Sequence, residues 1–220
     1  MDATSKPTMF QKLLSYVYPV RVESRSSEIN PVLDLFMYRG QWQLATSDAL
    51  YSDGDRYRPL VVAFKKMKRH LPEVKTVLVL GTGLGSAARI LHKVGNRALT
   101  TLVDIDEEVL QWALELMPEE IACHSRPVCS DAVSFLEENK EVYDLLIVDI
   151  FISRVVPDFV ITEIFLKKCR QRINTGGHFI MNYIVNDERE WDTLQGRLMN
   201  IFPDPEVILN GINRIVVAHF

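Results

Sequence analysis

A glycine-rich segment between two apolar runs constrains the fold of this chain more than any other feature. The run Val77–Leu80 is followed by glycines at positions 81, 83 and 85, and a helical pattern begins near Ser86. A second apolar run ends at Asp104, about twenty residues after the glycines. In a parallel α/β sheet, such glycines let the backbone approach a ligand, and an acid at the next strand end accepts hydrogen bonds from ribose hydroxyls. The segment therefore predicts a parallel sheet that binds an adenosyl group.

The spacing of these glycines leaves three interpretations open. Gly81-Thr-Gly83-Leu-Gly85 is the form found in S-adenosylmethionine (SAM) enzymes, whereas a dinucleotide fingerprint has its third small residue one position later. Ser86 is small enough for that position, so the spacing also allows a nicotinamide cofactor and a nucleotide-dependent oxidoreductase. The third interpretation is a glycine-rich turn without a ligand. The acid and the two flanking strands weigh against it.

The region before position 76 indicates small, local elements. Apolar positions within Phe10–Val20 suit a short helix or an arm that packs on a partner, or else a loosely ordered terminus. Arg39-Gly40 separates two apolar runs, which is typical of a β-hairpin. Pro59 then begins a helical run that extends to Leu71.

From Val77 onward, strand and helix patterns alternate, as in a parallel sheet covered by helices. The nearly continuous apolar run Tyr143–Phe151 is typical of a central strand buried on both faces. Asn210-Gly211 between two apolar runs predicts a final hairpin. We therefore predict an α/β fold with a doubly wound, mostly parallel sheet. Its expected parts are an N-terminal arm and β-hairpin, residues 1–58, and a SAM-binding Rossmann-like domain, residues 59–220.

Composition narrows the class of protein and its partners. With 220 residues, 47% of them hydrophobic, the chain can bury one good core. The net charge of -4 offers no basic surface for nucleic acid or an anionic membrane. No apolar run reaches the roughly 18 residues of a membrane span, and the polar N-terminus has no signal core. The cysteines at 123, 129 and 169 are odd in number and lack metal-ligand spacing. We therefore expect a cytoplasmic protein without a metal, a membrane or a nucleic-acid partner.

Ligands of an open α/β sheet bind outside the carboxyl ends of its strands. Asp104 ends such a strand, and its carboxylate can accept bonds from two ribose hydroxyls. Asp131 lies between a strand and a helix, so it is a helix cap, an adenine contact or both. The predicted cofactor-binding residues are Gly81, Thr82, Gly83, Gly85, Asp104, Ile105, Asp131 and Ala132.

Asp149, at the end of the most apolar strand, is the candidate for chemistry. Transfer of an alkyl group from a sulfonium needs a nucleophile that has lost its proton and is held in line. A carboxylate beside the cofactor can take that proton or stabilise the positive charge. The alternative is an acid that only accepts hydrogen bonds from neighbouring backbone amides.

From position 32 to position 185, the chain resembles the spermidine synthase family, a branch of the class I SAM-dependent methyltransferase superfamily. The resemblance rests on the hairpin, the glycine loop, Leu-Val-Asp-Ile-Asp at 102–106, Ser-Asp-Ala at 130–132, Tyr-Asp-Leu-Leu-Ile-Val-Asp at 143–149, and Thr-Glu-Ile-Phe followed by Gly-Gly within 162–177. Most methyltransferases of the superfamily have an acid two residues before the first glycine. This chain has Val79 there, and polyamine synthases likewise lack the acid. The resemblance implies a seven-stranded sheet, SAM or decarboxylated SAM as ligand, and dimers as a common state. It also implies ribose contact at Asp104 and adenine contact at Asp131.

Three positions depart from the pattern of the family. Leu84 replaces an acid that binds the aminopropyl amine, Ile152 replaces the second acid of Asp-x-x-Asp, which binds the polyamine, and Arg58 replaces a Gln or His. Buried ammonium groups need carboxylates or aromatic faces. We therefore expect a less charged acceptor with an apolar part. The segment before the core closes over the active site in the family. This segment supplies Tyr51, Asp55 and Tyr57 as predicted substrate residues. Ile152 and Tyr183, each near the end of a strand, complete the predicted set.

These observations predict a SAM-dependent transferase, and we expect methyl transfer to an unidentified small-molecule acceptor, in a homodimer. One alternative is aminopropyl transfer from decarboxylated SAM, as in polyamine biosynthesis. A second is a non-catalytic relative that binds an adenosyl ligand, or nothing, and acts through its dimer surface.

Overall fold

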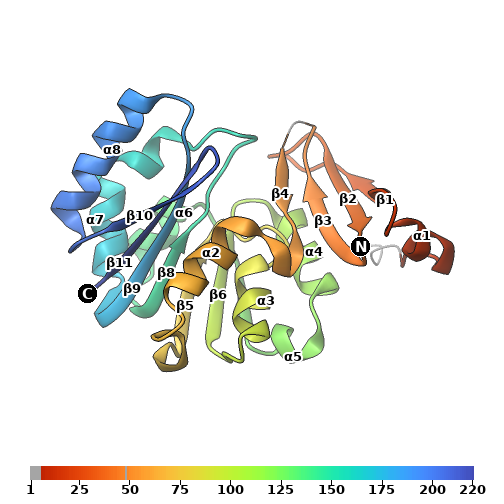
Figure 1. Cartoon of the computed structure of the whole chain (residues 1–220), viewed down its shortest axis with the longest axis horizontal. Helices are drawn as coiled ribbons and strands as arrows, with labels where there is room; N and C mark the ends of the chain where they lie inside the picture. The colour runs from red at the N-terminus through yellow and green to blue at the C-terminus, as the bar shows by residue number, and fades with distance from the viewer. Residues whose placement is uncertain (1–5, 48) are drawn as a thin grey trace.

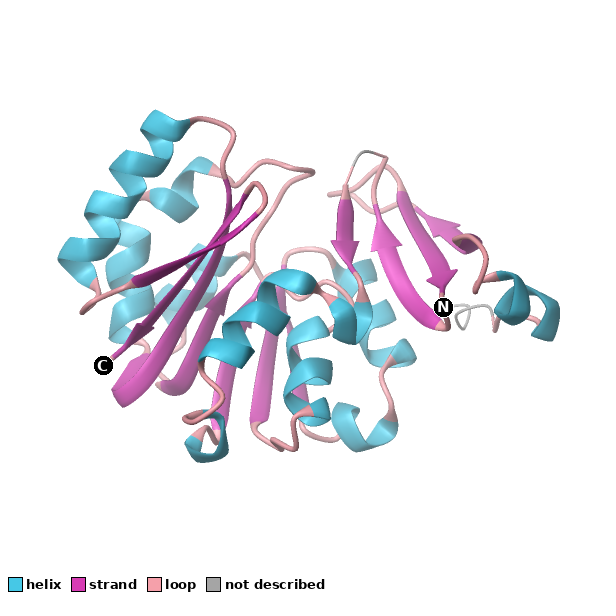
Figure 2. Ribbon diagram, in the orientation of Figure 1, coloured by secondary structure: helices cyan, strands magenta, loops and turns pink. Residues whose placement is uncertain are grey.

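The structure, a computed structural model, describes residues 6–47 and 49–220. Two sheets form the molecule: a large one flanked by helices and a small antiparallel one beside it (Figure 1). Figure 2 shows the small sheet at one end of the molecule, with α1 (Met9–Leu14) at its outer side.

The large sheet has seven strands in the order β10-β11-β9-β8-β5-β6-β7, and pairing from β7 to β9 is parallel. β10 and β11 form an antiparallel hairpin that continues the sheet beside β9. The strands are β5 (Thr76–Leu80), β6 (Leu99–Asp104), β7 (Ser125–Cys129), β8 (Tyr143–Val148), β9 (Ile173–Ile184), β10 (Glu206–Asn210) and β11 (Asn213–His219). This confirms the predicted doubly wound, mostly parallel sheet of seven strands.

Helices bury both faces of this sheet. Along β8, Leu146 and Val148 pack into the core under α6, α7 and α8, whereas Leu145 and Ile147 pack into the core under α2 and α3. A strand that is apolar on both faces needs cover on both sides, which explains its continuous hydrophobic sequence. The helices are α2 (Arg58–Lys66), α3 (Ser86–Lys93), α4 (Glu107–Leu116), α5 (Glu119–Ala122), α6 (Ala132–Glu138), α7 (Glu163–Gln171) and α8 (Glu188–Ile201).

The small sheet lies against the start of α3 and the face of α4. Its strands are β1 (Val20–Arg25), β2 (Leu33–Tyr38), β3 (Gln41–Ala45) and β4 (Leu50–Ser52), in that order. Leu33, Leu35 and Leu44 form a buried cluster with Leu84, Val109 and Trp112. We call this group the inter-sheet cluster. It fixes the small sheet above the glycine loop, which contributes Leu84.

The structure extends the predicted hairpin and shortens a predicted helix. The predicted hairpin is the centre of the four-stranded sheet, because β1 and β4 pair with its outer edges. β9 begins at Ile173, which pairs with Tyr143 before an irregularity in the register with β8. The helix that is expected to reach Leu71 ends at Lys66, and a separate 3-10 turn follows at Leu71–Glu73. The boundary between residues 58 and 59 stays a prediction.

Candidate active site

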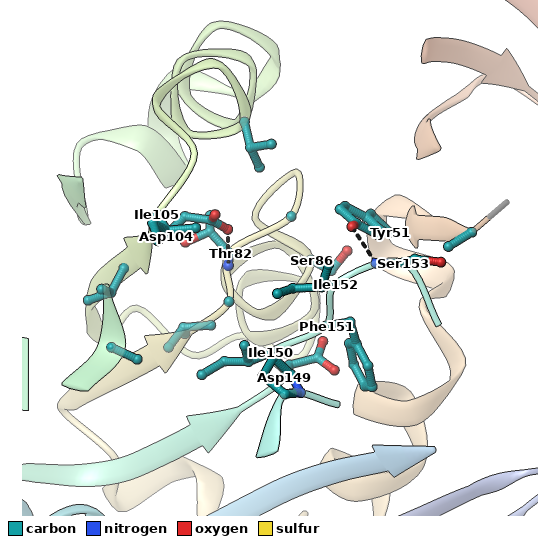
Figure 3. A pocket seen from close by; sticks show the side chains of 18 of the residues that line it. Tyr51, Thr82, Ser86, Asp104, Ile105, Asp149, Ile150, Phe151, Ile152 and Ser153 are labelled. Atoms are coloured by element: carbon teal, nitrogen blue, oxygen red, sulfur yellow. Dashed lines mark hydrogen bonds between the residues drawn. The ribbon is translucent and has the colours of Figure 1, made fainter. Parts of the chain in front are cut away.

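A cavity of about 370 Å³ lies outside the carboxyl ends of β5, β6, β7 and β8. The glycine loop contributes positions 81–83, the ends of β6 and β7 contribute 103–105 and 130–132, and the segment after β8 contributes 149–154. Asn30 and Tyr51 reach it from the small sheet. Figure 3 shows Asp104 beside Thr82 on one side and Asp149, Phe151 and Ile152 on the other.

Positive φ angles shape the glycine loop. Gly81 has a φ of +90°, and a Cβ there would collide with the backbone oxygen of Asp149. Gly85 has a φ of +72° as the N-cap of α3, and a Cβ there would collide with Met117. Gly81 therefore brings the ends of β5 and β8 together. Gly85 lies outside the cavity lining, where its conformation turns the chain into α3.

The Asp104 carboxylate is fixed by the loop that it faces. Its Oδ2 accepts a bond from the Thr82 amide at 2.8 Å, and its Oδ1 accepts one from the Asp106 amide at 3.1 Å. Burial raises the pKa of Asp104, although these amide bonds oppose the shift. The buried Oγ1 of Thr82 has no hydrogen-bond partner among the described residues, and Thr82 lines the cavity. Both side chains can therefore serve a polar ligand at this end of the cavity.

Asp131 caps α6 and also lines the cavity. Its Oδ1 accepts bonds from the amides of Val133 at 2.9 Å and Ser134 at 3.1 Å. A hydrogen bond from the Ser134 side chain is the largest cause that lowers the pKa of Asp131, and these two amide bonds lower it further. Ile105, about half exposed at 51%, and Ala132 line the same end. The capping role is thus present, and the adenine contact stays a prediction.

Asp149 is held by two side chains. Its Oδ1 accepts bonds from the Tyr57 hydroxyl at 3.1 Å and from Asn182 Nδ2 at 2.8 Å. Asn182 Nδ2 also donates to the Tyr57 hydroxyl at 3.0 Å, and Asn213 donates to Asn182 Oδ1 at 2.8 Å. Burial raises the pKa of Asp149 to about 6, and the two bonds partly oppose this.

This arrangement differs from an acid that merely accepts neighbouring backbone amides. Within residues 6–47 and 49–220, both hydrogen bonds to the Asp149 side chain come from side chains and end on Oδ1. Oδ2 therefore stays available for a proton from a ligand. Burial and the charge of Asp149 raise the pKa of Tyr57, so the Tyr57 hydroxyl keeps its proton and donates it to the hydrogen bond.

A hydrogen-bonded bridge joins the two ends of the cavity across the small sheet. The Tyr51 hydroxyl accepts a bond from the Ser153 amide at 2.8 Å and donates to Asn30 Oδ1 at 3.3 Å. Asn30 Nδ2 donates to Asp106 at 2.7 Å, next to the end of β6. The small sheet thereby holds the segment after β8 in a fixed position relative to Asp104 (Figure 3).

The predicted substrate residues separate into two groups. Tyr51, Tyr57 and Ile152 line the cavity. Asp55 does not, because it pairs with Lys93 at 2.7 Å and with Gln41. Tyr183 is buried on the face under α8, where its hydroxyl bonds to Glu190. The geometry therefore gives no support to a substrate contact by Asp55 or Tyr183.

Sequence reasoning missed Asn30 and Asn213. Single asparagines carry no motif, and these gain a role only through partners far along the chain. In the part of the chain that the structure describes, His, Cys, Asp and Glu form no group that could hold a metal ion. No described helix has the length and hydropathy to cross a membrane.

Residues 55–191, more than half of the chain, match the spermine/spermidine synthase domain family. Curated relatives include the polyamine aminopropyltransferases of Yersinia pestis (strain Pestoides F) and Yersinia pseudotuberculosis serotype O:1b (strain IP 31758). Each is 27% identical over 127 residues, which are 53% of this chain and 43% of the relative. The match thus spans less than half the length of these relatives.

Solved structures share the fold at low identity. A probable spermidine synthase from Corynebacterium glutamicum superposes with a TM-score of 0.77 at 17% identity, over 92% of this chain and 81% of that one. The spermidine synthase of Thermotoga maritima gives 0.69 at 20% identity, over 91% and 72%. Human methyltransferase-like protein 13 gives 0.60 at 19% identity, over 73% and 78%. These likenesses establish a Rossmann-like methyltransferase fold.

The comparisons contradict the expected methyl transfer. The matched family and the curated relatives are spermine/spermidine synthases and polyamine aminopropyltransferases, which favour the aminopropyl alternative. The resemblance inferred from the glycine loop and strand-end motifs is confirmed. The chain belongs to the spermine/spermidine synthase domain family.

Proposed function

We propose that this chain transfers an aminopropyl group from decarboxylated SAM to the nitrogen of an amine and releases methylthioadenosine. The observation that carries the proposal is Asp149, fixed through one oxygen by Tyr57 and Asn182 beside the glycine loop. Membership of the family and the names of the curated relatives support the same reaction.

The adenosyl end of the donor fits the cavity between the glycine loop and the ends of β6 and β7. Gly81 and Gly83 leave room for the backbone to approach the ligand, and Asp104 offers its carboxylate to the ribose hydroxyls. The adenine then lies against Ile105 and Ala132, with Asp131 as its polar contact. The unpartnered Thr82 hydroxyl supplies a further hydrogen bond.

Asp149 performs the proton step. An ammonium acceptor gives a proton to Oδ2, and its freed lone pair attacks the carbon next to the sulfonium. A C–N bond forms, the C–S bond breaks, and the electron pair stays on sulfur, which leaves as a neutral thioether. A carboxyl with a pKa of about 6 is ionised at neutral pH, yet it is basic enough to receive this proton. Tyr57 and Asn182 hold the carboxylate in one orientation, which limits the loss of entropy in the reaction.

The direct test is the release of methylthioadenosine. Purified chain is incubated with decarboxylated SAM and a panel of primary amines, and the product is quantified by mass spectrometry. In calorimetry, Asp149→Asn should bind methylthioadenosine with nearly unchanged affinity. It should nevertheless produce no methylthioadenosine from decarboxylated SAM. Turnover that survives in this variant would remove Asp149 from the proton step. Turnover of SAM with none of decarboxylated SAM would contradict the proposed donor.

A further inference from the structure

Beyond Asp149, the cavity presents exposed apolar side chains from three separate elements. Leu50 of β4 is 53% exposed, Ile152 of the segment after β8 is 62% exposed, and Ile212 of the β10–β11 turn is 60% exposed. Large aliphatic side chains that remain exposed around one cavity indicate a ligand group that covers them. Phe151 and Phe159 extend the same wall. We call these five residues the acceptor wall.

Carboxylates are scarce on this side. Among the described residues that line the cavity, the acids are Asp104, Asp131 and Asp149. The first two lie at the ends of β6 and β7, where they fit the adenosyl group. Among the described lining residues, Asp149 is therefore the acid that an acceptor meets.

The scarcity of carboxylates limits which chemical group the acceptor can carry beyond its reacting nitrogen. A second ammonium group on the acceptor would lose its water against aliphatic side chains without a carboxylate to replace it. The rings of Phe151 and Phe159 attract a cation less strongly than a carboxylate does. An alkyl or aryl group at the same place would instead cover the exposed wall, which is favourable.

We propose that the acceptor is a primary monoamine with an alkyl or aryl tail, and that Ile152 selects for this tail. The proposal rests on the proposed function, because Asp149 must receive the proton of the amine. The products are then an N-substituted 1,3-diaminopropane and methylthioadenosine.

Ile152 is held in a defined position. Its amide donates to the Val155 oxygen at 2.9 Å, and the Val155 amide donates back at 3.1 Å, which makes a tight turn. Ser153 within this turn has a φ of +59°, and its amide is bonded to Tyr51. A side chain at position 152 therefore acts from a fixed backbone.

The first experiment compares hexylamine with 1,6-diaminohexane as acceptors for decarboxylated SAM. The two differ only in the second ammonium group, so length and flexibility are matched. We expect kcat/KM for hexylamine to exceed that for the diamine by about tenfold or more. Equal or better use of the diamine would overturn the monoamine proposal while the transfer reaction stands. No methylthioadenosine from these two amines, putrescine, spermidine or phenethylamine would overturn the proposed function itself.

The second experiment changes the charge at position 152. Ile152→Asp should reverse the preference between the two amines by about tenfold or more. Ile152→Asn has nearly the same shape without the charge, and Val155→Asp places a charge on the same turn outside the cavity lining. Neither control should gain activity on the diamine. If either matches Ile152→Asp, the selection by charge at position 152 is refuted. Calorimetry with methylthioadenosine verifies that each variant is folded.

Discussion

At the scale of single residues, the paired donors on Asp149 determine when it can act. Burial places the pKa of Asp149 at about 6, and the bonds from Asn182 and Tyr57 lower it from a still higher value. The carboxylate must be ionised to receive a proton. We therefore expect kcat/KM to rise with pH through a midpoint near 6. A rate profile without an inflection between about pH 5 and 7 would contradict this assignment.

Tyr57→Phe isolates one of these donors. Loss of the hydroxyl removes a bond that favours the charged carboxylate, so the midpoint should move to higher pH. The shift should be about one pH unit at most, because such a bond is worth roughly 1.5 kcal/mol and one pKa unit corresponds to about 1.4 kcal/mol. Activity well above the new midpoint should approach that of the unchanged chain. A uniform loss at every pH would instead assign Tyr57 to substrate binding.

Asp104→Ala tests the donor end of the cavity. Two ribose hydroxyls would lose a charged acceptor, and each such bond is worth about 1.5–3 kcal/mol, so affinity for methylthioadenosine should fall by at least about tenfold. Asp55→Ala is the matched control, since Asp55 pairs with Lys93 outside the cavity. Calorimetry gives both affinities. Unchanged affinity in Asp104→Ala would reject the ribose contact.

At the scale of elements, the Tyr51 hydroxyl links the small sheet to the segment after β8. Tyr51→Phe deletes the oxygen that joins the Ser153 amide to Asn30. Hydrogen–deuterium exchange should then rise several-fold in residues 150–156 while β8 stays protected, because the β8 ladder does not depend on Tyr51. Unchanged exchange in that segment would show that the bridge does not restrain it.

The elements that sequence predicted well have local signals. Asp106, Asp131 and Asp187 cap α4, α6 and α8 with their own side chains, so those helix starts could be read directly. β1 and β4 were missed because their stability comes from pairing with the central hairpin; β4 has only three residues. Periodicity cannot reveal so short a strand.

The same distinction explains the site. Glycines and strand-end acids are encoded in short motifs, and the structure places Gly81, Asp104 and Asp149 around one cavity. Asn182 and Asn213, by contrast, act across neighbouring strands. Tyr183 was named because it ends the run of a strand, but alternation along β9 turns it to the opposite face from Asn182.

At the scale of the whole molecule, a cluster of three histidines links pH to stability. The rings of His178 and His219 stack with centroids 4.4 Å apart, and His70 lies 4.9 Å from His178. Burial and the two neighbouring imidazoles lower the pKa of His178 to about 4, although Asp144 opposes this.

The unfolded chain therefore binds more protons at His178 between pH 4 and 6.5, so stability from this residue is lost as the pH falls through that range. His178→Phe keeps a ring without a proton site. The Tm of the unchanged chain should fall by several degrees relative to this variant between those pH values. The difference between the two chains is measured because Asp149, whose pKa is raised, makes stability change with pH in the opposite direction, and it does so in both chains. A constant difference would exclude His178 as the source.

The expected homodimer also belongs to this scale. α1 and the turn after it expose Met9, Phe10, Leu13 and Val17, each by 65% or more. We predict that a second copy covers these side chains, because large apolar residues exposed together often mark a protein–protein contact. Phe10→Asp with Leu13→Asp should convert a dimer to a monomer in light scattering with unchanged affinity for methylthioadenosine. A monomer before the change would disprove the dimer.

The inter-sheet cluster gives different consequences to the two positions, 84 and 152, at which this chain has an apolar residue where the family pattern has an acid. Ile152 stands at an open surface, so an acid at that position would keep its charge in contact with water. Leu84 is fully buried against Trp112 and holds the small sheet in place. An acid at position 84 would bring an unpaired charge into that contact and cost several kcal/mol before any ligand could benefit. The fold therefore tolerates an acid at the acceptor end of the cavity, whereas packing of the two sheets excludes one at position 84.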